Sequence, residues 1–305
     1  IGNNRIIVID EAQRVSEIGL TLKRITDNFT NVQLLVTGSS SFELQSNLSE
    51  PLTGRKYEYH LYPISTAELY DSQGLLPVKQ MFESRLIYGS YPDIINHTDE
   101  AKELLMNIAN SYLYKDLLAM NEIRRPILLE KLLIALALQV GSEVSYNEVA
   151  QTIGTDNKTV EKYIDLLEKC YVIFRLNAFN RNLRTELKKS KKIYFYDNGI
   201  RNAVIQNFAP LSLRQDTGAL WENFFISERI KANHYNGNYA KSFFWRTTQQ
   251  QEIDYIEEAD GNFTAFEMKW NPNKRPITFP SPFLNNYPVK ETVVITPENY
   301  LEWVM

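Results

Sequence analysis

Two carboxylates and a lysine near the C-terminus are spaced as on a β-hairpin. Residues 252–256 (Glu-Ile-Asp-Tyr-Ile) alternate polar and apolar side chains, and residues 265–269 (Ala-Phe-Glu-Met-Lys) follow the hairpin turn signal Asp260-Gly261. Side chains two apart on a strand share a face, so Glu267 and Lys269 should point the same way. Asp254 can then join them across the hairpin.

These residue types would suit chemistry at a phosphodiester. Asp254 and Glu267, with Glu222 from a preceding helix, could hold Mg²⁺ or Mn²⁺ as oxygen ligands. Lys269 would orient water or stabilise charge on phosphorus as a catalytic group. The alternative is an exposed strand face with a Glu267–Lys269 salt bridge.

A second set of polar residues follows two apolar segments near the N-terminus. Asp10 and Glu11 end the first segment, Thr37 and Ser39 end the second, and Arg55 comes later. The carboxyl edge of a parallel sheet is where α/β folds bind ligands. An acid there can hold Mg²⁺ through water, a second acid can activate water, and the hydroxyls can sense a γ-phosphate. Arg55 would neutralise transition-state charge.

Basic residues gather in one stretch of an acidic chain. Residues 158–192 hold ten Lys or Arg against four acids, whereas the whole chain has a net charge of −4. Such a stretch suits the phosphate backbone of nucleic acid, and a solvated loop or a protein contact is the alternative. The predicted nucleic-acid contacts are Lys158, Lys162, Arg181, Arg184, Lys188 and Lys189.

The order of elements predicts a multidomain α/β protein. Residues 1–75 read as part of a P-loop-type parallel sheet, 76–140 as a helical lid, 141–200 as a winged helix-turn-helix and 201–305 as a restriction-endonuclease-like α/β domain. Residues 6–9 should be a strand buried on both faces, since they are continuously apolar. Residues 57–62 alternate and predict a further strand, and Ser65 with Glu68 forms a capping box.

The composition argues against a disulfide-bonded protein, a membrane-spanning protein and a zinc protein. The 305 residues are 44% hydrophobic, and the single cysteine, Cys170, cannot form an internal disulfide, which favours a cytoplasmic setting. The longest apolar run, 132–138, is too short for a membrane span, so we expect no membrane partner. The three histidines are scattered along the sequence without zinc-ligand spacing.

The N-terminal motifs resemble those of prokaryotic AAA-type ATPases that carry a C-terminal domain of unknown function. Residues 6–13 (IIVIDEAQ) look like a Walker B motif and 34–40 (LLVTGSS) like a sensor 1 strand. The resemblance continues through segments 52–65, 88–92 and 218–223. It implies ATP as cofactor, with Asp10 serving magnesium, Glu11 as catalytic base and Ser39 as sensor.

The chain departs from that pattern in one respect. The sequence Gly-x-x-x-x-Gly-Lys-Ser/Thr, whose backbone and lysine cradle the phosphates, does not occur in it. We expect this loop to lie upstream, because Ile1 is not an initiator methionine and a strand follows almost at once. These 305 residues alone should not bind ATP tightly.

The C-terminal motifs resemble the PD-(D/E)xK nuclease superfamily. Asp254 matches the aspartate, Glu267 and Lys269 the (D/E)xK, and Glu222 the helix glutamate, while Ile253 replaces the proline. The two resemblances together imply an ATP-driven protein with a DNA-binding winged helix and a nuclease-like domain, in which homo-oligomers are conceivable. A non-catalytic ATP-controlled switch that binds nucleic acid or protein is the alternative.

Overall fold

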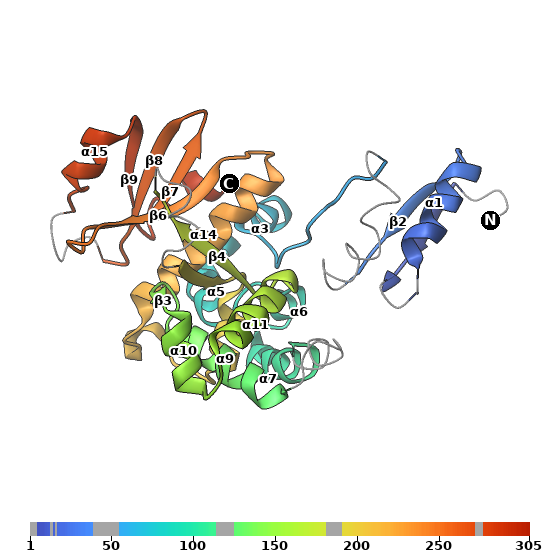
Figure 1. Ribbon diagram of the computed structural model, residues 1–305, viewed down its shortest axis with the longest axis horizontal. Helices are drawn as coiled ribbons and strands as arrows, with labels where there is room; N and C mark the ends of the chain where they lie inside the picture. Colours follow the sequence, from blue (N-terminus) through green and yellow to red (C-terminus); the bar gives the residue numbers. More distant parts are fainter. Residues whose placement is uncertain are drawn as a thin grey trace.

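The chain forms a small N-terminal piece and a larger body, joined by an extended segment (Figure 1). The computed structural model describes residues 5–12, 15, 17–38, 55–113, 125–180, 191–271 and 277–305. Helices surround a mixed sheet in the body, so the protein is α/β, consistent with a multidomain organisation.

The N-terminal piece is a two-stranded parallel sheet with one helix. Strands β1 (Ile6–Ile9) and β2 (Gln33–Val36) pair in register, and α1 (Ile18–Asn28) lies between them in sequence. Ile18 and Leu22 of α1 are buried against apolar residues of both strands. The helix therefore covers one face of this sheet.

The other face of that sheet is bare, which corrects the expectation of a strand buried on both sides. Ile6, Val8 and Leu35 are 62%, 61% and 54% exposed, and they alternate with the covered residues. A continuous apolar run predicts two covered faces only when a second layer is present. Among the described residues no such layer lies over β1 and β2.

Residues 57–62 are extended but form no strand in the described part of the chain, contrary to the prediction. Their alternation has another cause. Tyr57, Tyr59 and Leu61 are 86–92% exposed, while His60 and Tyr62 turn inward and contact aromatic rings of the body. One face of the segment thus docks on side chains and not on a neighbouring strand.

Short helices open the body. The capping box at Ser65 and Glu68 is confirmed: Ser65 Oγ accepts from the Glu68 backbone N–H, and the Glu68 carboxylate accepts from the Ser65 N–H. The helices that follow are α3 (Thr66–Gln73), α4 (Leu75–Gln80), α5 (Phe82–Tyr88), α6 (Pro92–Asn96), η2 (Thr98–Glu100), α7 (Ala101–Asn107), the π-helical η3 (Ile108–Leu113) and α9 (Pro126–Leu138).

A helix-turn-helix unit comes next. Its elements are β3 (Glu143–Val144), α10 (Tyr146–Ile153), α11 (Asn157–Lys169), β4 (Ile173–Ala178) and β5 (Lys191–Phe195). Ser145 caps α10 and Asp156 caps α11, each by accepting a backbone N–H three residues on. Gly154 takes the left-handed conformation that the turn between the helices requires.

The C-terminal part builds the rest of the sheet. Its elements are α13 (Asn198–Val204), η4 (Leu211–Leu213), α14 (Thr217–Tyr235), β6 (Lys241–Arg246), β7 (Glu252–Ala259), β8 (Asn262–Met268), α15 (Ser281–Asn286), β9 (Val289–Ile295) and α16 (Leu301–Val304). The strand order is β3-β5-β4-β6-β7-β8-β9. Parallel pairing of β4 with β6, at Asn177–Phe243 and Ala178–Phe244, joins the two halves.

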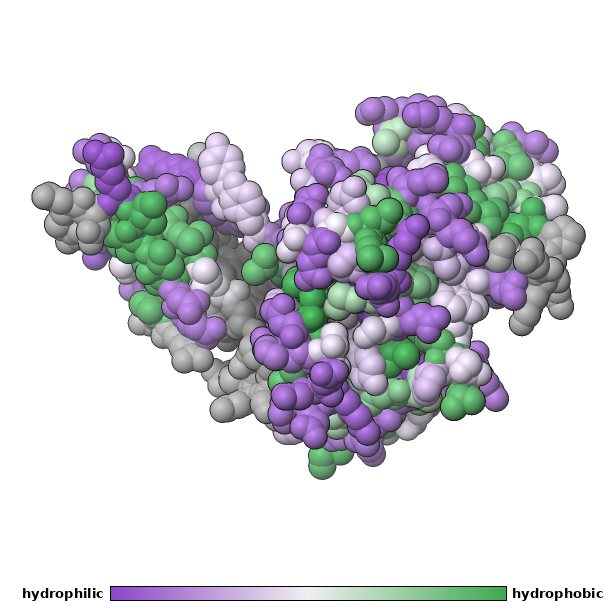
Figure 2. Space-filling view, turned by 180° about the vertical axis from the view of Figure 1, so that it is seen from behind, coloured by the Kyte–Doolittle hydropathy of each residue, from purple (hydrophilic) through white to green (hydrophobic). Residues whose placement is uncertain are grey.

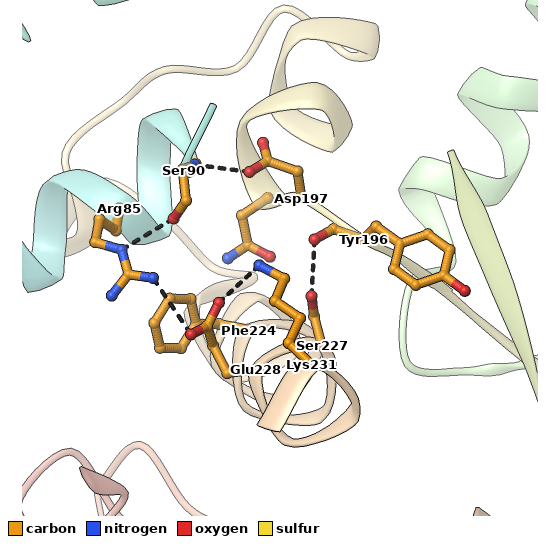
Figure 3. A pocket seen from close by; sticks show the side chains of 10 residues that line it. Arg85, Ser90, Tyr196, Asp197, Phe224, Ser227, Glu228 and Lys231 are labelled. Carbon is orange, nitrogen blue, oxygen red and sulfur yellow. Dashed lines mark hydrogen bonds and ion pairs between the residues drawn. The ribbon is translucent and has the colours of Figure 1, made fainter. Parts of the chain in front are cut away.

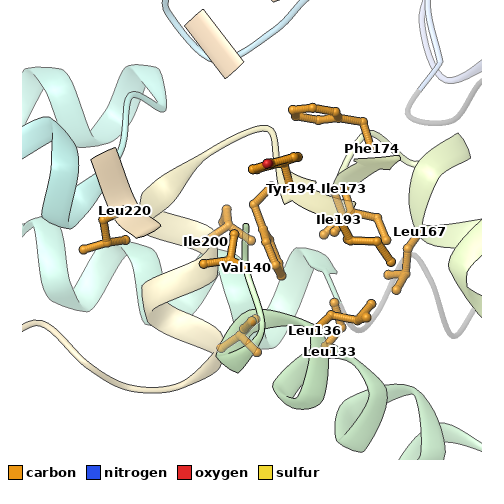
Figure 4. Packing of buried hydrophobic residues seen from close by; sticks show 14 of the residues in the cluster. Leu133, Leu136, Val140, Leu167, Ile173, Phe174, Ile193, Tyr194, Ile200 and Leu220 are labelled. Atoms are coloured by element: carbon orange, nitrogen blue, oxygen red, sulfur yellow. The ribbon is translucent and has the colours of Figure 1, made fainter. Parts of the chain in front are cut away.

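One large hydrophobic core runs through the body. Leu133 and Leu136 of α9 pack with Leu167 of α11 and Ile193 of β5, and Leu220 of α14 belongs to the same cluster (Figure 4). In a smaller cluster, Phe283 of α15 packs with apolar residues of the sheet. Because α14 and the helix-turn-helix unit bury aliphatic side chains in the same cluster, they pack together.

Candidate functional site

The predicted hairpin carboxylates and lysine lie together in the structure. Strands β7 and β8 pair antiparallel around the Asp260-Gly261 turn, which brings Asp254 beside the end of β8. Lys269 Nζ lies 2.7 Å from Glu267 Oε2 and 3.6 Å from Asp254 Oδ2. Asp254 Oδ2 also accepts the Met268 backbone N–H at 2.9 Å, which fixes its position.

Glu222, predicted as the fourth member, approaches from α14. Its carboxylate and that of Asp254 interact electrostatically, as does its carboxylate with the Lys269 ammonium. Gly141, in the left-handed conformation after α9, passes so close that a Cβ there would lie 3.4 Å from the Glu222 carboxylate. The turn that joins α9 to β3 therefore lies against Glu222.

Three further residues belong to this group and were not predicted as members. Lys192 Nζ is 3.2 Å from Glu222 Oε1 and 2.6 Å from Glu252 Oε1, and the Tyr194 hydroxyl donates to Glu222 Oε1 at 2.6 Å. Lys192 and Tyr194 share a face of β5 by strand alternation, as Glu252 and Asp254 do on β7. The sequence indicates which residues share a face of each strand, but it does not indicate that β5 packs against α14.

Burial and mutual repulsion perturb the carboxylates. Burial, followed by the nearby Asp254, raises the pKa of Glu267 to about 7. Burial likewise raises the pKa of Glu222 to about 7, although the Lys192 ammonium opposes the rise. Burial acts to lower the pKa of Lys192, but Glu222 and Glu252 outweigh it and raise that pKa. Lys192 therefore stays charged near neutral pH, where Glu222 and Glu267 titrate.

In this arrangement the carboxylates are paired with lysines. Within the residues that the structure describes, no group of three or more His, Cys, Asp or Glu side chains is disposed to hold one. Lys192 instead pairs with Glu222 and Glu252, and Lys269 pairs with Asp254 and Glu267. As it stands, the site is a cluster in which two ammonium groups pair with four carboxylates.

The predicted nucleotide-binding residues divide into three groups. Asp10 and Thr37 lie together at the carboxyl ends of β1 and β2, where the Thr37 hydroxyl donates to the Asp10 carboxylate. Glu11 adjoins them with a left-handed φ of 53°. Arg55 pairs instead with Asp27 of α1. Ser39 lies outside the described residues.

The predicted nucleic-acid contacts are described only in part. Lys158 and Lys162 are exposed on α11, on the side opposite the buried Val160 and Ile164. Arg181, Arg184, Lys188 and Lys189 fall in residues 181–190, outside the described part of the chain. Of the six predicted contacts, the structure therefore describes the two on α11.

A buried polar network between α14, α5 and the start of α13 escaped prediction (Figure 3). Glu228 of α14 accepts hydrogen bonds from Thr66 and Lys231 and pairs with Arg85, and all these side chains are at most 2% exposed. Asp197 caps α13 and accepts the Ser90 backbone N–H. The cavity among them, about 10 Å³, has room for about one water.

Two of the three histidines, scattered in the sequence, meet in the fold. The ring centroids of His60 and His234 are 5.1 Å apart, and Tyr62 stacks on Tyr196 at 5.4 Å. Burial and then His60 lower the pKa of His234. This aromatic group anchors the extended segment to the body.

Comparison with known protein families places similarities along most of the chain. An AAA domain family matches residues 1–70, a domain of unknown function (DUF8612) matches 79–211, and another (DUF4143) matches 217–302. None of the helices in the described ranges has both the length and the apolarity needed to cross a membrane. No solved structure matches the chain.

Curated relatives come from bacteria and archaea and are themselves uncharacterized proteins. One from Haemophilus influenzae is 28% identical over 65% of this chain and 52% of its own length. One from Mycobacterium tuberculosis is 26% identical over 88% of this chain and 59% of its own length. One from Methanocaldococcus jannaschii is 23% identical over 84% of this chain and 59% of its own length. The chain thus spans between half and three-fifths of their length. The matches at its two ends support an AAA-type ATPase-like protein.

Proposed function

We propose that this chain is part of an AAA-type protein that binds and hydrolyses ATP, contacts DNA through a winged helix, and carries a PD-(D/E)xK nuclease-like domain. The observation that carries the proposal is the meeting of Glu222, Asp254, Glu267 and Lys269, predicted from motif spacing, beside the helix-turn-helix unit. The similarity to DUF4143 covers all four residues. Their substrate class would be a phosphodiester.

The N-terminal piece supports the ATPase part. Asp10 and Thr37 present exposed oxygens at one sheet edge, a donor set that suits magnesium carried by ATP. Magnesium would neutralise phosphate charge there, and Glu11 would orient water. ATP binding would also need a phosphate-cradling loop that the sequence of this chain does not contain.

The bare face of β1 and β2 fits the same proposal. Figure 2 shows hydrophobic side chains gathered on this part of the molecule, and Ile6, Val8 and Leu35 are more than half exposed. Patches of this kind mark interaction surfaces in soluble proteins. We expect further elements of an ATPase core to cover it.

The helix-turn-helix unit supports the DNA-binding part. A helix, a short strand, two helices and a two-stranded hairpin, with strand order β3-β5-β4, is the element order of a winged helix. In that arrangement α11 would enter the major groove. Lys158 and Lys162 on its exposed side would contact phosphates.

Cleavage of single- and double-stranded DNA in Mn²⁺ or Mg²⁺ tests the nuclease-like part. We expect cleavage that is lost in Asp254→Ala and Lys269→Ala and kept in Glu258→Ala, a control on the same strand as Asp254. Cleavage that persists in both site variants, or no cleavage by the unaltered protein, would overturn this part.

Salt-dependent DNA binding tests the winged helix separately. Replacing Lys158 and Lys162 with Glu should weaken binding and lower the slope of log affinity against log salt by about two, or more where the new acids repel phosphates. Glu130→Lys on α9 serves as a charge control on another helix. An unchanged slope in the double variant would exclude α11 as the contact surface.

A non-catalytic switch is the second candidate, and the lysine pairing favours it. Lys192 and Lys269 already form ion pairs with the carboxylates, as in an inert scaffold. Folds of this kind serve binding as well as catalysis. Salt-sensitive DNA binding without cleavage, in protein shown to be folded, would support the switch.

A further inference from the structure

A lysine from the helix-turn-helix unit reaches into the carboxylate site of the C-terminal part. Lys192 lies on β5, yet its side chain is 3% exposed and its ammonium contacts Glu222 of α14 and Glu252 of β7. Lysine is almost never this deeply buried unless it is paired. The ammonium also lies 5.5 Å from the Phe244 ring centroid, so apolar surface closes the other side.

The contacts of Lys192 use the carboxylate that a cation would need. Glu222 Oε1 already receives the Lys192 ammonium at 3.2 Å and the Tyr194 hydroxyl at 2.6 Å, both from the same face of β5. A Mg²⁺ or Mn²⁺ ion requires oxygen ligands at about 2.0–2.2 Å and repels a neighbouring ammonium. An ion bound to Glu222 would therefore lie close to the Lys192 ammonium, and the two positive charges would oppose each other.

We propose that Lys192 holds the cation position of the nuclease-like site, so that Lys192 and a divalent metal ion compete for Glu222. This rests on the proposed function, because it assigns Glu222 to that site. The competition explains why the carboxylates come together and yet form no metal-binding group among the described residues. It makes metal affinity depend on a residue of the helix-turn-helix unit.

Mn²⁺ binding to the whole chain, followed by isothermal titration and by the electron paramagnetic resonance signal of free Mn²⁺, tests the competition. Lys192→Met keeps an apolar stem over Phe244 and removes the charge. We expect it to bind Mn²⁺ at least about tenfold more tightly than the unaltered protein, because the ammonium no longer opposes the ion. Lys191→Met, the adjacent residue of β5, should leave the affinity unchanged.

A second variant guards against loss of folding, since Lys192→Met alone leaves Glu222 and Glu252 without their buried partner. Lys192→Met combined with Glu252→Gln restores the net charge of the unaltered protein and keeps Glu222 and Asp254. It should also gain Mn²⁺ affinity, and a further Glu222→Gln change should abolish the gain. Circular dichroism and the thermal unfolding midpoint establish that each variant is folded.

The outcomes separate this inference from the proposed function. Equal Mn²⁺ affinity in the unaltered protein and in both folded Lys192 variants would overturn the competition, whatever the cleavage assay gives. Gained Mn²⁺ affinity with no DNA cleavage by the unaltered protein or by any variant would support the competition and overturn the nuclease activity. Gained affinity that survives Glu222→Gln would move the ion elsewhere and refute the role of Glu222.

Discussion

Removing the Glu228 carboxylate should destabilise the protein strongly. This side chain is 2% exposed, accepts from Thr66 N and Oγ at 2.5 and 2.6 Å and from Lys231 Nζ at 2.8 Å, and lies 3.3 Å from the Arg85 guanidinium. In Glu228→Ala both cations would stay buried without their partner. Breaking a buried ion pair in this way costs about 3–5 kcal/mol.

The pKa of Glu228 gives a similar magnitude by another route. Burial acts to raise this pKa, but Lys231 and Arg85 outweigh burial and lower it from 4.5 to about 2. That lowering corresponds to about 3 kcal/mol in favour of the charged form in the folded protein. We therefore expect Glu228→Ala to lower the free energy of unfolding by at least about 3 kcal/mol.

Urea unfolding followed by tryptophan fluorescence and circular dichroism measures this loss. Glu130→Ala, at an exposed position of α9, should change the free energy by no more than about 0.5 kcal/mol. Adding Lys231→Ala to Glu228→Ala removes one stranded cation, so the double variant should lose about 1–3 kcal/mol less than the two single losses together. A loss below about 1 kcal/mol in Glu228→Ala, or strict additivity, would refute the reasoning.

Three further predictions concern stability. Because the pKa of Glu228 is depressed, its contribution is complete above pH 4.5 and disappears as the pH falls towards 2, so Glu228→Gln should flatten the acid side of an unfolding-midpoint against pH curve. Gly199→Ala would place a Cβ 2.1 Å from the Tyr88 carbonyl oxygen and should cost about 3 kcal/mol in urea unfolding, whereas Gly218→Ala, with nothing within 4 Å, should be neutral or stabilising. Phe283→Ala empties the centre of the smaller cluster and should cost about 3–5 kcal/mol by the same assay, and a cost like that of an exposed alanine change would contradict the packing.

Local patterns predicted local geometry well. The capping box at Ser65 and Glu68 follows from side chains that bond backbone groups within one turn. The approach of Asp254, Glu267 and Lys269 follows from strand alternation around a two-residue turn. In both cases the residues that interact lie on one element or on neighbouring elements, so their spacing in the sequence determines their contact.

These local patterns did not predict which elements that are distant in the sequence contact one another. Alternation at 57–62 identified residues sharing a face but not what they face, which proved to be aromatic rings and not a strand. In the sequence, Lys192 is one of ten basic residues in a charged stretch. In the structure, its ammonium forms ion pairs with Glu222 of α14 and Glu252 of β7. Nothing local to β5 indicates which helix lies across it.

The shared sheet has a mechanical consequence. Strands β4 and β6 pair edge to edge at Asn177–Phe243 and Ala178–Phe244, and β7 and β8 follow β6 in the same sheet. A force applied to α11 would therefore reach β7 and β8 through the backbone hydrogen bonds of one sheet. The core cluster that spans both halves resists their separation in the same direction. We therefore expect a rotation of the helix-turn-helix unit to carry the carboxylate site with it.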